Sequence, residues 1–480
     1  MATERLARMG VDRLLAAGLL TLAAIVCTAQ SSSTESSTPQ ASIPQSSPPQ
    51  SSSGSHRAVH HIQVPDEDSA SQPAELTEAE AAIDKQNYVA AEVLLRKLVG
   101  RDSSNYVAWF DLGFVENALG HVEESVAAYR KSVAAKPDVF EANLNLGLQL
   151  AKMGQPDAET FLRAATHLKP TSHPAEGQYR AWLALGHTLE GAKPEDALAA
   201  YRQASTLQPK EAEPHLVAGQ LLEKENKFAD AEGEYKAAMA LDERSTDAVI
   251  GLANIYMRGR KFSEAEEYLR KLLANDRQSE VQGEIESKVQ TAAVHIQLGR
   301  VLAAEGKTDG AIAEMEKGLK LTPADDAAQR DLAELYAGAG KNDLAETAYR
   351  GLVQLHPNDA ELHRRLGQAL LRQRKFPEAE QEFLATLKLN PALAEAYGDL
   401  AFAASERGDY PLVIRALDAR AKLLPEIPTA YFLRASAYDH LHDVKKAEAN
   451  YRLFLKTANG KYPEQEWQAT HRLNALEPRK

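Results

Sequence analysis

A small residue returns along this chain at a nearly fixed interval. Seven of the ten steps between these residues measure 34, one measures 33, and two are stretched to 39 and 46. We call them marker residues: Ala91, Ser125, Ala158, Ala197, Ala231, Ala265, Ala311, Ala345, Ala379, Val413 and Ala447. A constant period of this length indicates one small supersecondary unit that is copied and stacked. We therefore expect a solenoid, whose function is carried by its surfaces.

Around each marker residue the sequence keeps a second pattern of aromatic, leucine, glycine and proline residues. The clearest copy has Trp109, Leu112 and Gly113 before its marker residue, and Tyr129 and Pro137 after it. Small residues let two helices cross closely, apolar residues at helical spacing form the stripe that a neighbouring helix covers, and proline ends a helix. This pattern resembles the tetratricopeptide repeat, a unit of two helices.

The resemblance covers about four-fifths of the chain and implies an all-α fold. It implies a right-handed α-solenoid of about eleven helix pairs over residues 72–461, followed by a capping helix and tail over 462–480. The capping helix is expected over Glu464–Glu477 with Trp467 and Leu473 facing inward, because a terminal repeat must cover one apolar face.

Two inserts interrupt the interval between marker residues. Residues 173–178 precede the fourth unit, and we expect them to form a longer loop. Residues 280–291 precede the seventh unit, where Val281, Ile285 and Val289 lie four apart, which is helical spacing. The second insert therefore predicts an N-terminal extension of a helix that continues to about Ala304.

The first 29 residues have the form of a signal peptide. Three arginines precede an apolar run over residues 14–26, which is short for a membrane span. The small residues Cys27 and Ala29 fit cleavage after Ala29, which predicts an exported protein, periplasmic or secreted. Two alternatives stay open: a lipoprotein anchored through a lipidated Cys27, and an uncleaved N-terminal anchor. Only these alternatives would associate the chain with a membrane.

Residues 30–71 follow as a segment of low complexity. Its first part, residues 30–55, consists mostly of serine, proline and glutamine. Such a composition cannot bury an apolar core, so we expect a disordered tether between the signal peptide and the repeats.

Composition excludes several classes of function. Cys27 is the single cysteine, so residues 30–480 can hold no disulfide and no thiolate metal site. The formal net charge is −13, which argues against a nucleic-acid partner because phosphates require a basic face. Within the repeats, Glu alternates with Lys or Arg, as is ordinary on a solvated helix surface.

The sequence contains no pattern that predicts catalysis or a bound cofactor. A glycine-rich phosphate loop, a Gly-x-Ser-x-Gly turn and a His-Glu-x-x-His helix are all missing. The candidate metal ligands form two short clusters, Asp439, His440, His442 and Asp443 near the C-terminus and His60 with His61 in the tether. The first cluster falls at a turn between two helices, where polar residues are common, and a hidden transferase or peptidase activity would rest on it alone. We therefore expect no enzyme, no metal and no small-molecule substrate.

The resemblance also implies where a partner would bind. In this family the first helix of each pair lines a concave groove, and its fifth, sixth, ninth and thirteenth positions point inward. The fifth position carries apolar residues in six units and arginines after them: Phe110, Leu144, Leu183, Leu216, Ile250 and Ile296, then Arg330 and Arg364. Three further arginines, Arg300, Arg365 and Arg372, lie near the last two. Such a groove would suit a protein or peptide with an apolar stretch and an acidic end.

A second interpretation of the same residues stays open. The apolar side chains could be half-buried between neighbouring first helices, and the arginines could pair with local glutamates such as Glu334 and Glu361. Two family functions also find poor matches. The carboxylate clamp would begin at Arg364 but meets Asp399 where it needs asparagine, and the asparagine row of protein O-glycosyltransferases is broken because Asp111 precedes Asn145.

These observations predict a non-enzymatic scaffold that mediates protein–protein interaction in the cell envelope or periplasm. The alternative is a periplasmic component of a polysaccharide or protein secretion and assembly system, because the array resembles the periplasmic repeats of such systems.

Overall fold

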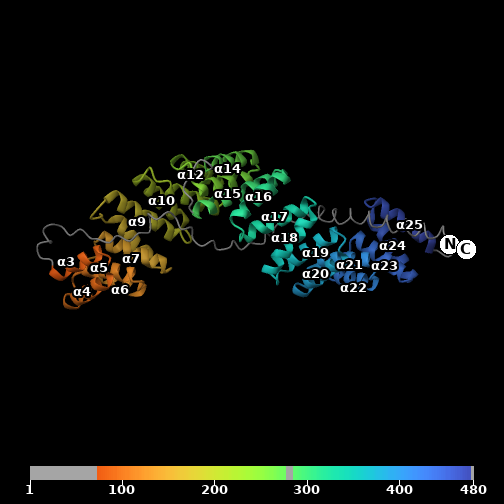
Figure 1. Ribbon diagram of the computed structural model, residues 1–480, viewed down its shortest axis with the longest axis horizontal. Helices are drawn as coiled ribbons and strands as arrows, with labels where there is room; N and C mark the ends of the chain where they lie inside the picture. Colours follow the sequence, from red (N-terminus) through yellow and green to blue (C-terminus); the bar gives the residue numbers. More distant parts are fainter. Residues whose placement is uncertain (1–72, 277–284, 477–480) are drawn as a thin grey trace. The chain divides into compact units, whose positions relative to one another are not determined.

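The structure is a computed structural model that describes residues 73–276 and 285–476. Within these ranges every regular element is an α-helix, and the helices follow one another in pairs (Figure 1). The described residues form two compact units, which we call the N-terminal unit, 73–276, and the C-terminal unit, 285–476. The predicted signal peptide and tether, with Cys27, His60 and His61, lie outside the described residues.

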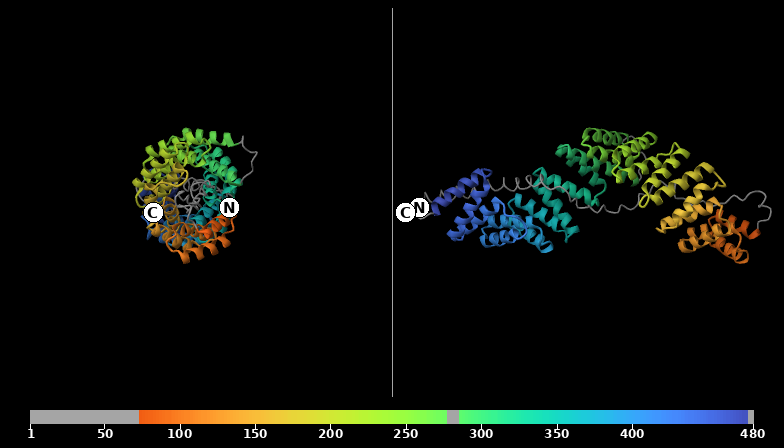
Figure 2. Two further views of the ribbon diagram at one scale, coloured as in Figure 1. Left: turned by 90° about the vertical axis from the view of Figure 1, so that its left-hand side faces the viewer. Right: turned by 180° about the vertical axis from the view of Figure 1, so that it is seen from behind.

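The N-terminal unit holds six helix pairs. Its helices are α3 (Ala74–Asp84), α4 (Tyr88–Arg101), α5 (Tyr106–Ala118), α6 (Val122–Ala135), α7 (Phe140–Lys152), α8 (Ala158–His167), α9 (Pro174–Leu189), α10 (Pro194–Leu207), α11 (Glu213–Lys224), α12 (Phe228–Leu241), α13 (Thr246–Arg258) and α14 (Phe262–Asp276). Each helix packs against the next one along the chain, as Figure 2 shows from two further sides.

The C-terminal unit holds five helix pairs and one further helix. Its helices are α15 (Ile285–Ala304), α16 (Thr308–Leu321), α17 (Asp326–Gly338), α18 (Asn342–Leu355), α19 (Ala360–Arg372), α20 (Phe376–Leu389), α21 (Ala394–Arg407), α22 (Tyr410–Ala421), α23 (Pro428–His440), α24 (Val444–Ala458) and α25 (Pro463–Leu476). The described residues thus contain the eleven pairs that the marker residues predict, and α25 packs on α24 as the predicted cap.

The marker residues explain why the period is so strict. Ten of them are the fourth residue of the second helix of their pair, and Ala158 is the first residue of α8. All eleven are 0% exposed. At this point the second helix lies against the first helix, so a larger side chain would force the two apart. In the second repeat, the hydroxyl of Ser125 also donates a hydrogen bond of 2.7 Å to the carbonyl of Gly113.

Glycine and an aromatic ring form the second fixed contact within a pair. A Cβ added to Gly113 would lie 2.7 Å from the ring of Tyr129, and one added to Gly367 would lie 2.6 Å from that of Phe383. Both rings are 0% exposed. The first helix therefore needs glycine where the aromatic residue of the second helix presses against it.

Lysine–carboxylate pairs join the second helices of neighbouring repeats. The ammonium of Lys193, just before α10, lies 2.7 Å from Glu159 on α8. Lys375, just before α20, lies 2.6 Å from Glu346 on α18. A lysine at this position recurs at Lys193, Lys227, Lys261, Lys307, Lys341 and Lys375, each four residues before its marker residue.

The two inserts both lengthen helices. The prediction of a loop over 173–178 is wrong, because α9 begins at Pro174 and includes the rest of the insert. Proline suits the first position of a helix, and His173 before it has a left-handed φ of 45° that turns the chain into the helix. The prediction for the second insert is confirmed for 285–291, which form the first turns of α15, while 280–284 lie outside the described residues.

The capping helix is present, but one of its predicted contacts is wrong. Trp467 is 68% exposed and stacks on His471, with 5.4 Å between ring centroids. Instead, α25 buries Gln465 and Ala469. Leu473 is partly buried against the apolar cluster that contains Ala469 and Phe454. Trp467 lies two residues before Ala469, so it falls on another side of the helix.

Candidate partner-binding surface

Most of the predicted apolar row belongs to the core. Phe110 and Leu144 are 0% exposed, Leu183 is 1% exposed and Ile296 is 4% exposed. Phe110, for example, packs against the ring of Tyr129, with 5.6 Å between centroids. These four side chains are out of a partner's reach, which corrects their assignment to the groove surface.

Two members of the row stay accessible. Leu216 on α11 and Ile250 on α13 are only partly buried. They occupy the same position in consecutive repeats of the N-terminal unit. Of the six apolar residues, these two therefore form the part of the row that a partner can touch.

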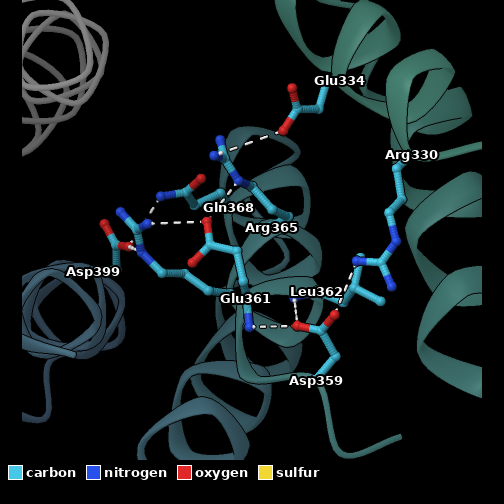
Figure 3. Close-up of polar contacts among 9 residues, drawn as sticks. Arg330, Glu334, Asp359, Glu361, Leu362, Arg365, Gln368 and Asp399 are labelled. Atoms are coloured by element: carbon cyan, nitrogen blue, oxygen red, sulfur yellow. Dashed lines mark hydrogen bonds and ion pairs between the residues drawn. The ribbon is translucent and has the colours of Figure 1, made fainter. Parts of the chain in front are cut away.

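All five predicted arginines have partners, and four of them pair with carboxylates. Arg330 on α17 binds Asp326 at 3.0 Å and Asp359 at 2.9 Å. Arg364 on α19 binds Asp399 on α21 at 2.9 Å. Figure 3 shows Arg330, Arg365 and their acidic neighbours around the start of α19. The other contacts are Arg300 to Asp331 at 2.8 Å, Arg365 to Glu361 at 2.8 Å and to Glu334 at 3.7 Å, and Arg372 to the carbonyl of Ala337 at 2.6 Å.

The local sequence of α19 creates this arrangement. Asp359 is the residue before the helix, and its side chain accepts hydrogen bonds from the backbone amides of Glu361 and Leu362. Such a cap leaves the second carboxylate oxygen of Asp359 for Arg330 (Figure 3). Glu361 lies one helical turn before Arg364 and Arg365 and pairs with both.

The carboxylates on this surface are held in the charged form to different degrees. Burial alone would raise the pKa of Asp359, but the hydrogen bond and charge of Arg330, together with the hydrogen bonds from the amides of Leu362 and Glu361, outweigh it, and the pKa is lowered. Asp399 behaves in the opposite way. Burial raises its pKa, although Arg364 and Gln368 both favour the charged carboxylate.

The arginines therefore form a network of ion pairs, as the second interpretation of the sequence expects. Arg364, with 16% of its side chain exposed, is the most enclosed of the four that pair with carboxylates. Paired charges largely cancel at a distance, so this network gives little long-range attraction for an acidic partner. The prediction of a basic end to the groove is therefore corrected. The surface carries a nearly neutral row of ion pairs, which we call the ladder, formed by Arg300, Arg330, Arg364 and Arg365 with their carboxylates.

One contact geometry recurs between successive first helices. The residue 11 before the marker of one repeat meets the residue 14 before the marker of the next, and we call this the cross-repeat contact. In the C-terminal unit it joins Arg300 to Asp331 at 2.8 Å, Glu334 to Arg365 at 3.7 Å, and Gln368 to Asp399 at 3.0 Å. Each of these contacts joins partners of complementary charge or hydrogen-bonding character.

Asp111 is the residue that the sequence reasoning did not select. It occupies on α5 the position that Asp331 and Asp399 occupy in their repeats, 14 before the marker residue. Its side chain is 1% exposed, and neither carboxylate oxygen has a hydrogen-bond partner among the described residues. The sequence does contain a signal for it. Glu80 lies 11 residues before its marker residue and Asp111 lies 14 before the next, so the two positions of the cross-repeat contact both carry an acidic residue here.

The C-terminal cluster of histidine and aspartate is built from other contacts. Asp439 binds Arg472 at 2.7 Å, and His440 stacks on Tyr410 with centroids 4.3 Å apart. The side chain of Asp443 accepts a hydrogen bond from the amide of Lys446 at the start of α24. Across residues 73–276 and 285–476, no group of three or more His, Cys, Asp or Glu side chains is placed to hold a metal ion.

None of the helices that the structure describes combines the length and apolar character needed to cross a bilayer. The predicted signal peptide lies outside the two described ranges.

A curated protein shares a short stretch of this sequence. The mouse (Mus musculus) Protein O-mannosyl-transferase TMTC3 is 24% identical over 168 residues, which are 32% of this chain and 18% of that protein. The chain thus spans less than a fifth of the length of this relative. The shared stretch is too short a part of that protein to carry its activity over.

Solved structures of repeat proteins align with larger parts of the chain. The C-terminal part of a TPR repeat-containing protein from Cytophaga hutchinsonii is 18% identical, with a TM-score of 0.43, and covers 52% of this chain and 98% of that one. YrrB, described as a TPR protein with an unusual peptide-binding site, is 19% identical, with a TM-score of 0.35, and covers 42% of this chain and 96% of its own.

Family models match the repeats themselves. Two models described as tetratricopeptide repeat fit residues 76–140, 187–238, 296–360, 330–394 and 364–412, and residues 224–283. Together these segments take up more than half of the chain, and they fall on the helix pairs described above. The chain therefore belongs to the tetratricopeptide repeat family.

Proposed function

We propose that this protein is an exported, non-enzymatic scaffold that binds a protein or peptide partner in the cell envelope. The observation that carries the proposal is the cross-repeat contact. In the C-terminal unit it aligns equivalent positions of successive first helices, so that side chains form rows along the stack. Rows of this kind offer an extended surface to an extended partner, which suits binding better than catalysis.

Two further features support the proposal. Leu216 and Ile250 are equivalent, partly exposed apolar side chains on neighbouring first helices of the N-terminal unit. Residues 1–29 have the charge and apolar pattern of an export signal. Tetratricopeptide repeats generally act as non-catalytic binding modules, and the described residues contain no competing metal cluster.

Partner capture tests the binding part of the proposal. The full chain is immobilised and exposed to an envelope extract, beside the variant Leu216→Glu with Ile250→Glu. A matched control carries Val89→Glu with Val93→Glu on the outer face of α4, where both valines are 64% exposed. We expect saturable capture by the native chain and the control, and at least a tenfold loss in the first variant.

Equal capture by all three proteins would contradict a binding surface on the first helices. The identity of the captured protein separates the two envelope roles. Recovery of a β-barrel protein of a secretion system would favour a polysaccharide or protein secretion component, whereas recovery of soluble periplasmic proteins would favour a general scaffold.

Protein mass tests export. Processing after Ala29 yields a chain that begins at Gln30, and lipidation yields one that begins at a modified Cys27. We expect the first product in the soluble envelope fraction of an expressing bacterium. An unprocessed chain in the cytosol would contradict export while leaving partner binding unaffected.

A further inference from the structure

The turn before the capping helix contains the one Asn-Gly dipeptide of the sequence, Asn459 with Gly460. Both residues are exposed, and both have a left-handed backbone, with φ of 52° at Asn459 and 77° at Gly460. The amide of Lys461 donates a hydrogen bond of 3.1 Å to the carbonyl of Ala458, which closes the turn between α24 and α25 (Figure 1). The direction in which α25 leaves α24 therefore depends on the backbone of this dipeptide.

An asparagine followed by glycine can react with its own backbone. The amide nitrogen of Gly460 attacks Cγ of Asn459, so that a bond forms between these atoms while the bond from Cγ to Nδ2 breaks. Nδ2 leaves as ammonia with the proton of the attacking nitrogen, and a cyclic succinimide remains. Water then opens the ring, at Cγ to give aspartate or at the main-chain carbonyl to give isoaspartate. Glycine favours the attack because no Cβ shields its nitrogen.

The folded backbone prevents this attack. Asn459 has a ψ of 43°. In an L-residue this angle places the next amide nitrogen on the side of the Cα–C bond opposite Cβ, so the nitrogen of Gly460 cannot reach Cγ. Attack requires rotation about ψ, and that rotation swings α25 away from α24 because the dipeptide is the connection between them. The reaction therefore requires the capping helix to undock first.

The contact that holds the capping helix is small. In α25 only Gln465 and Ala469 are buried, whereas α24 buries four side chains. Arg472 adds two hydrogen bonds of 2.7 Å to Asp439 on α23, and this arginine is about half exposed. A terminal helix with few buried apolar contacts opens locally at a small cost in free energy. Undocking of α25 is therefore expected while the rest of the C-terminal unit stays folded.

We propose that Asn459 is a deamidation site that is protected while α25 is docked and reacts when α25 undocks. The products then oppose redocking. A carboxylate at residue 459 directly follows the last residue of α24, where the helix dipole is negative and disfavours an anion. Isoaspartate also carries the chain through one additional carbon atom, so the hydrogen bond between Lys461 and Ala458 no longer fits. Release of the cap is thus made permanent by a covalent change.

Release of the cap changes the surface that the protein presents. Phe454 is 0% exposed and belongs, with Ala458, to the apolar cluster that Ala469 of α25 completes. The ring of Tyr462, between the two helices, lies 6.2 Å from that of Phe454. Undocking of α25 uncovers this cluster, so the modified protein has an apolar end that the native protein covers.

Peptide mapping by mass spectrometry tests the site. The full chain is incubated in mildly alkaline buffer, which favours the deprotonated attacking nitrogen, and each asparagine peptide is followed for conversion of its amide to an acid. Asn226 is the internal control, because it is also exposed with a left-handed φ of 59° but precedes Lys227. We expect Asn459 to deamidate at least tenfold faster than Asn226, with isoaspartate among the products.

Variants of α25 test the dependence on undocking. Ala469→Asp places a charge at a position that is 0% exposed and should accelerate deamidation of Asn459 at least tenfold. Ala475→Asp makes the same change at an exposed position of the same helix and, as the matched control, should react as the native chain does. Arg472→Gln removes the hydrogen bonds to Asp439 without altering the apolar contact, and it should accelerate the reaction at least twofold.

Hydrogen exchange tests the release of the cap. After incubation, the deamidated chain should lose protection over residues 463–476, whereas Asn459→Gly, which permits the left-handed turn without the reactive amide, should keep it. Equal rates at Asn459 and Asn226, a rate in Ala469→Asp and Arg472→Gln equal to the native rate, or unchanged exchange after deamidation would each overturn the inference. Partner capture at Leu216 and Ile250 does not depend on these results, so the proposed function is tested separately.

Discussion

The two units use the same pair of repeat positions, those of the cross-repeat contact, with opposite results. In the C-terminal unit, Asp331 and Asp399 are each met by a donor from the preceding first helix. In the N-terminal unit, Asp111 stands at the same repeat position and is met by Glu80. The fold sets which positions meet, and the side chains then decide whether the contact stabilises or destabilises the stack.

This difference affects how much each unit gains in stability from its charged side chains. The charges of the C-terminal ladder satisfy one another, so a partner would have to break ion pairs to use them. Asp111 on α5 has no such hydrogen-bond partner among the described residues. The arginines of the C-terminal unit therefore contribute to folding, whereas the buried carboxylate of Asp111 works against it.

The largest expected effect tests whether the two units fold separately. Phe383 is fully buried against Gly367 in the C-terminal unit. Phe383→Ala should lower the free energy of unfolding of that unit by about 3–5 kcal/mol, because it leaves a cavity. Hydrogen exchange measured by mass spectrometry should show lost protection in 285–476 and retained protection in 73–276.

The neighbouring residue gives the control for this change. Leu384 is 45% exposed on the same helix, and Leu384→Ala should change the stability by less than about 0.5 kcal/mol. An equal loss of protection in both units on Phe383→Ala would show that they unfold as one body.

A charge reversal in the ladder should have the next largest effect. Arg364→Glu would place a third carboxylate beside Glu361 and Asp399, which Arg364 now neutralises. Loss of one partner from a buried pair costs about 3–5 kcal/mol, and partial exposure reduces this to roughly 2 kcal/mol here. Urea unfolding of the C-terminal unit measures it, and a stability equal to that of the native chain would contradict the ladder.

The stability of the two units should depend on pH in different ways, because the pKa of Glu346 in the C-terminal unit is lowered and that of Asp111 in the N-terminal unit is raised. Burial alone would raise the pKa of Glu346, but Lys375, Arg350 and Gln373 hold it at about 2, against an ordinary 4.5. Its stabilising contribution is therefore complete above pH 4.5 and is lost as the pH falls towards 2. Glu346→Gln should destabilise the C-terminal unit at pH 7 and have little effect at pH 2, as urea unfolding at several pH values would show.

Asp111 should give the reverse dependence. Its folded pKa lies above the ordinary 3.8, so ionisation penalises the fold above that folded pKa, and the penalty is absent below 3.8. Asp111→Asn should therefore stabilise the N-terminal unit at pH 7, and its advantage should shrink as the pH falls. A constant advantage at every pH would contradict the unpaired carboxylate.

The smallest expected effect lies at the exposed edge of the ladder. The side chains of Arg365 and Glu334 are 40% and 61% exposed, and their nitrogen and oxygen lie 3.7 Å apart. Arg365→Gln should change the stability by about 0–1 kcal/mol, because solvent screens an exposed pair. A loss above about 2 kcal/mol in a thermal melt would mean that the ladder acts cooperatively.

The fold was largely predictable because its repeating contacts depend on residue size. A marker residue at 0% exposure tolerates only small side chains, so the repeat period can be recognised in the sequence from the spacing of small residues. The sequence does not distinguish an extra helical turn from a loop at 173–178, because the two have similar local composition. It does not predict the orientation of Trp467 either, because a terminal helix has no further repeat to determine which of its faces is covered.

The candidate surface was less predictable. Phe110 and Leu144 share a sequence position with Leu216 and Ile250, yet the first two are buried and the last two are partly exposed. That difference depends on how tightly neighbouring repeats pack, which one repeat does not encode. The buried position of Asp111 near Glu80 depends on the preceding repeat, so no motif within a single repeat contains it.

The eleven buried marker residues give the chain a structural reading frame. Removal of one residue inside a helix pair shifts every later side chain on that helix by about 100° around its axis, which turns core positions outwards. Removal of a whole period restores the phase, so the array can lengthen or shorten by entire repeats while each surviving pair keeps its packing. Evolution of such a chain is therefore expected to proceed in steps of 34 residues, with the two longer steps marking where a change of another length was absorbed by a helix end.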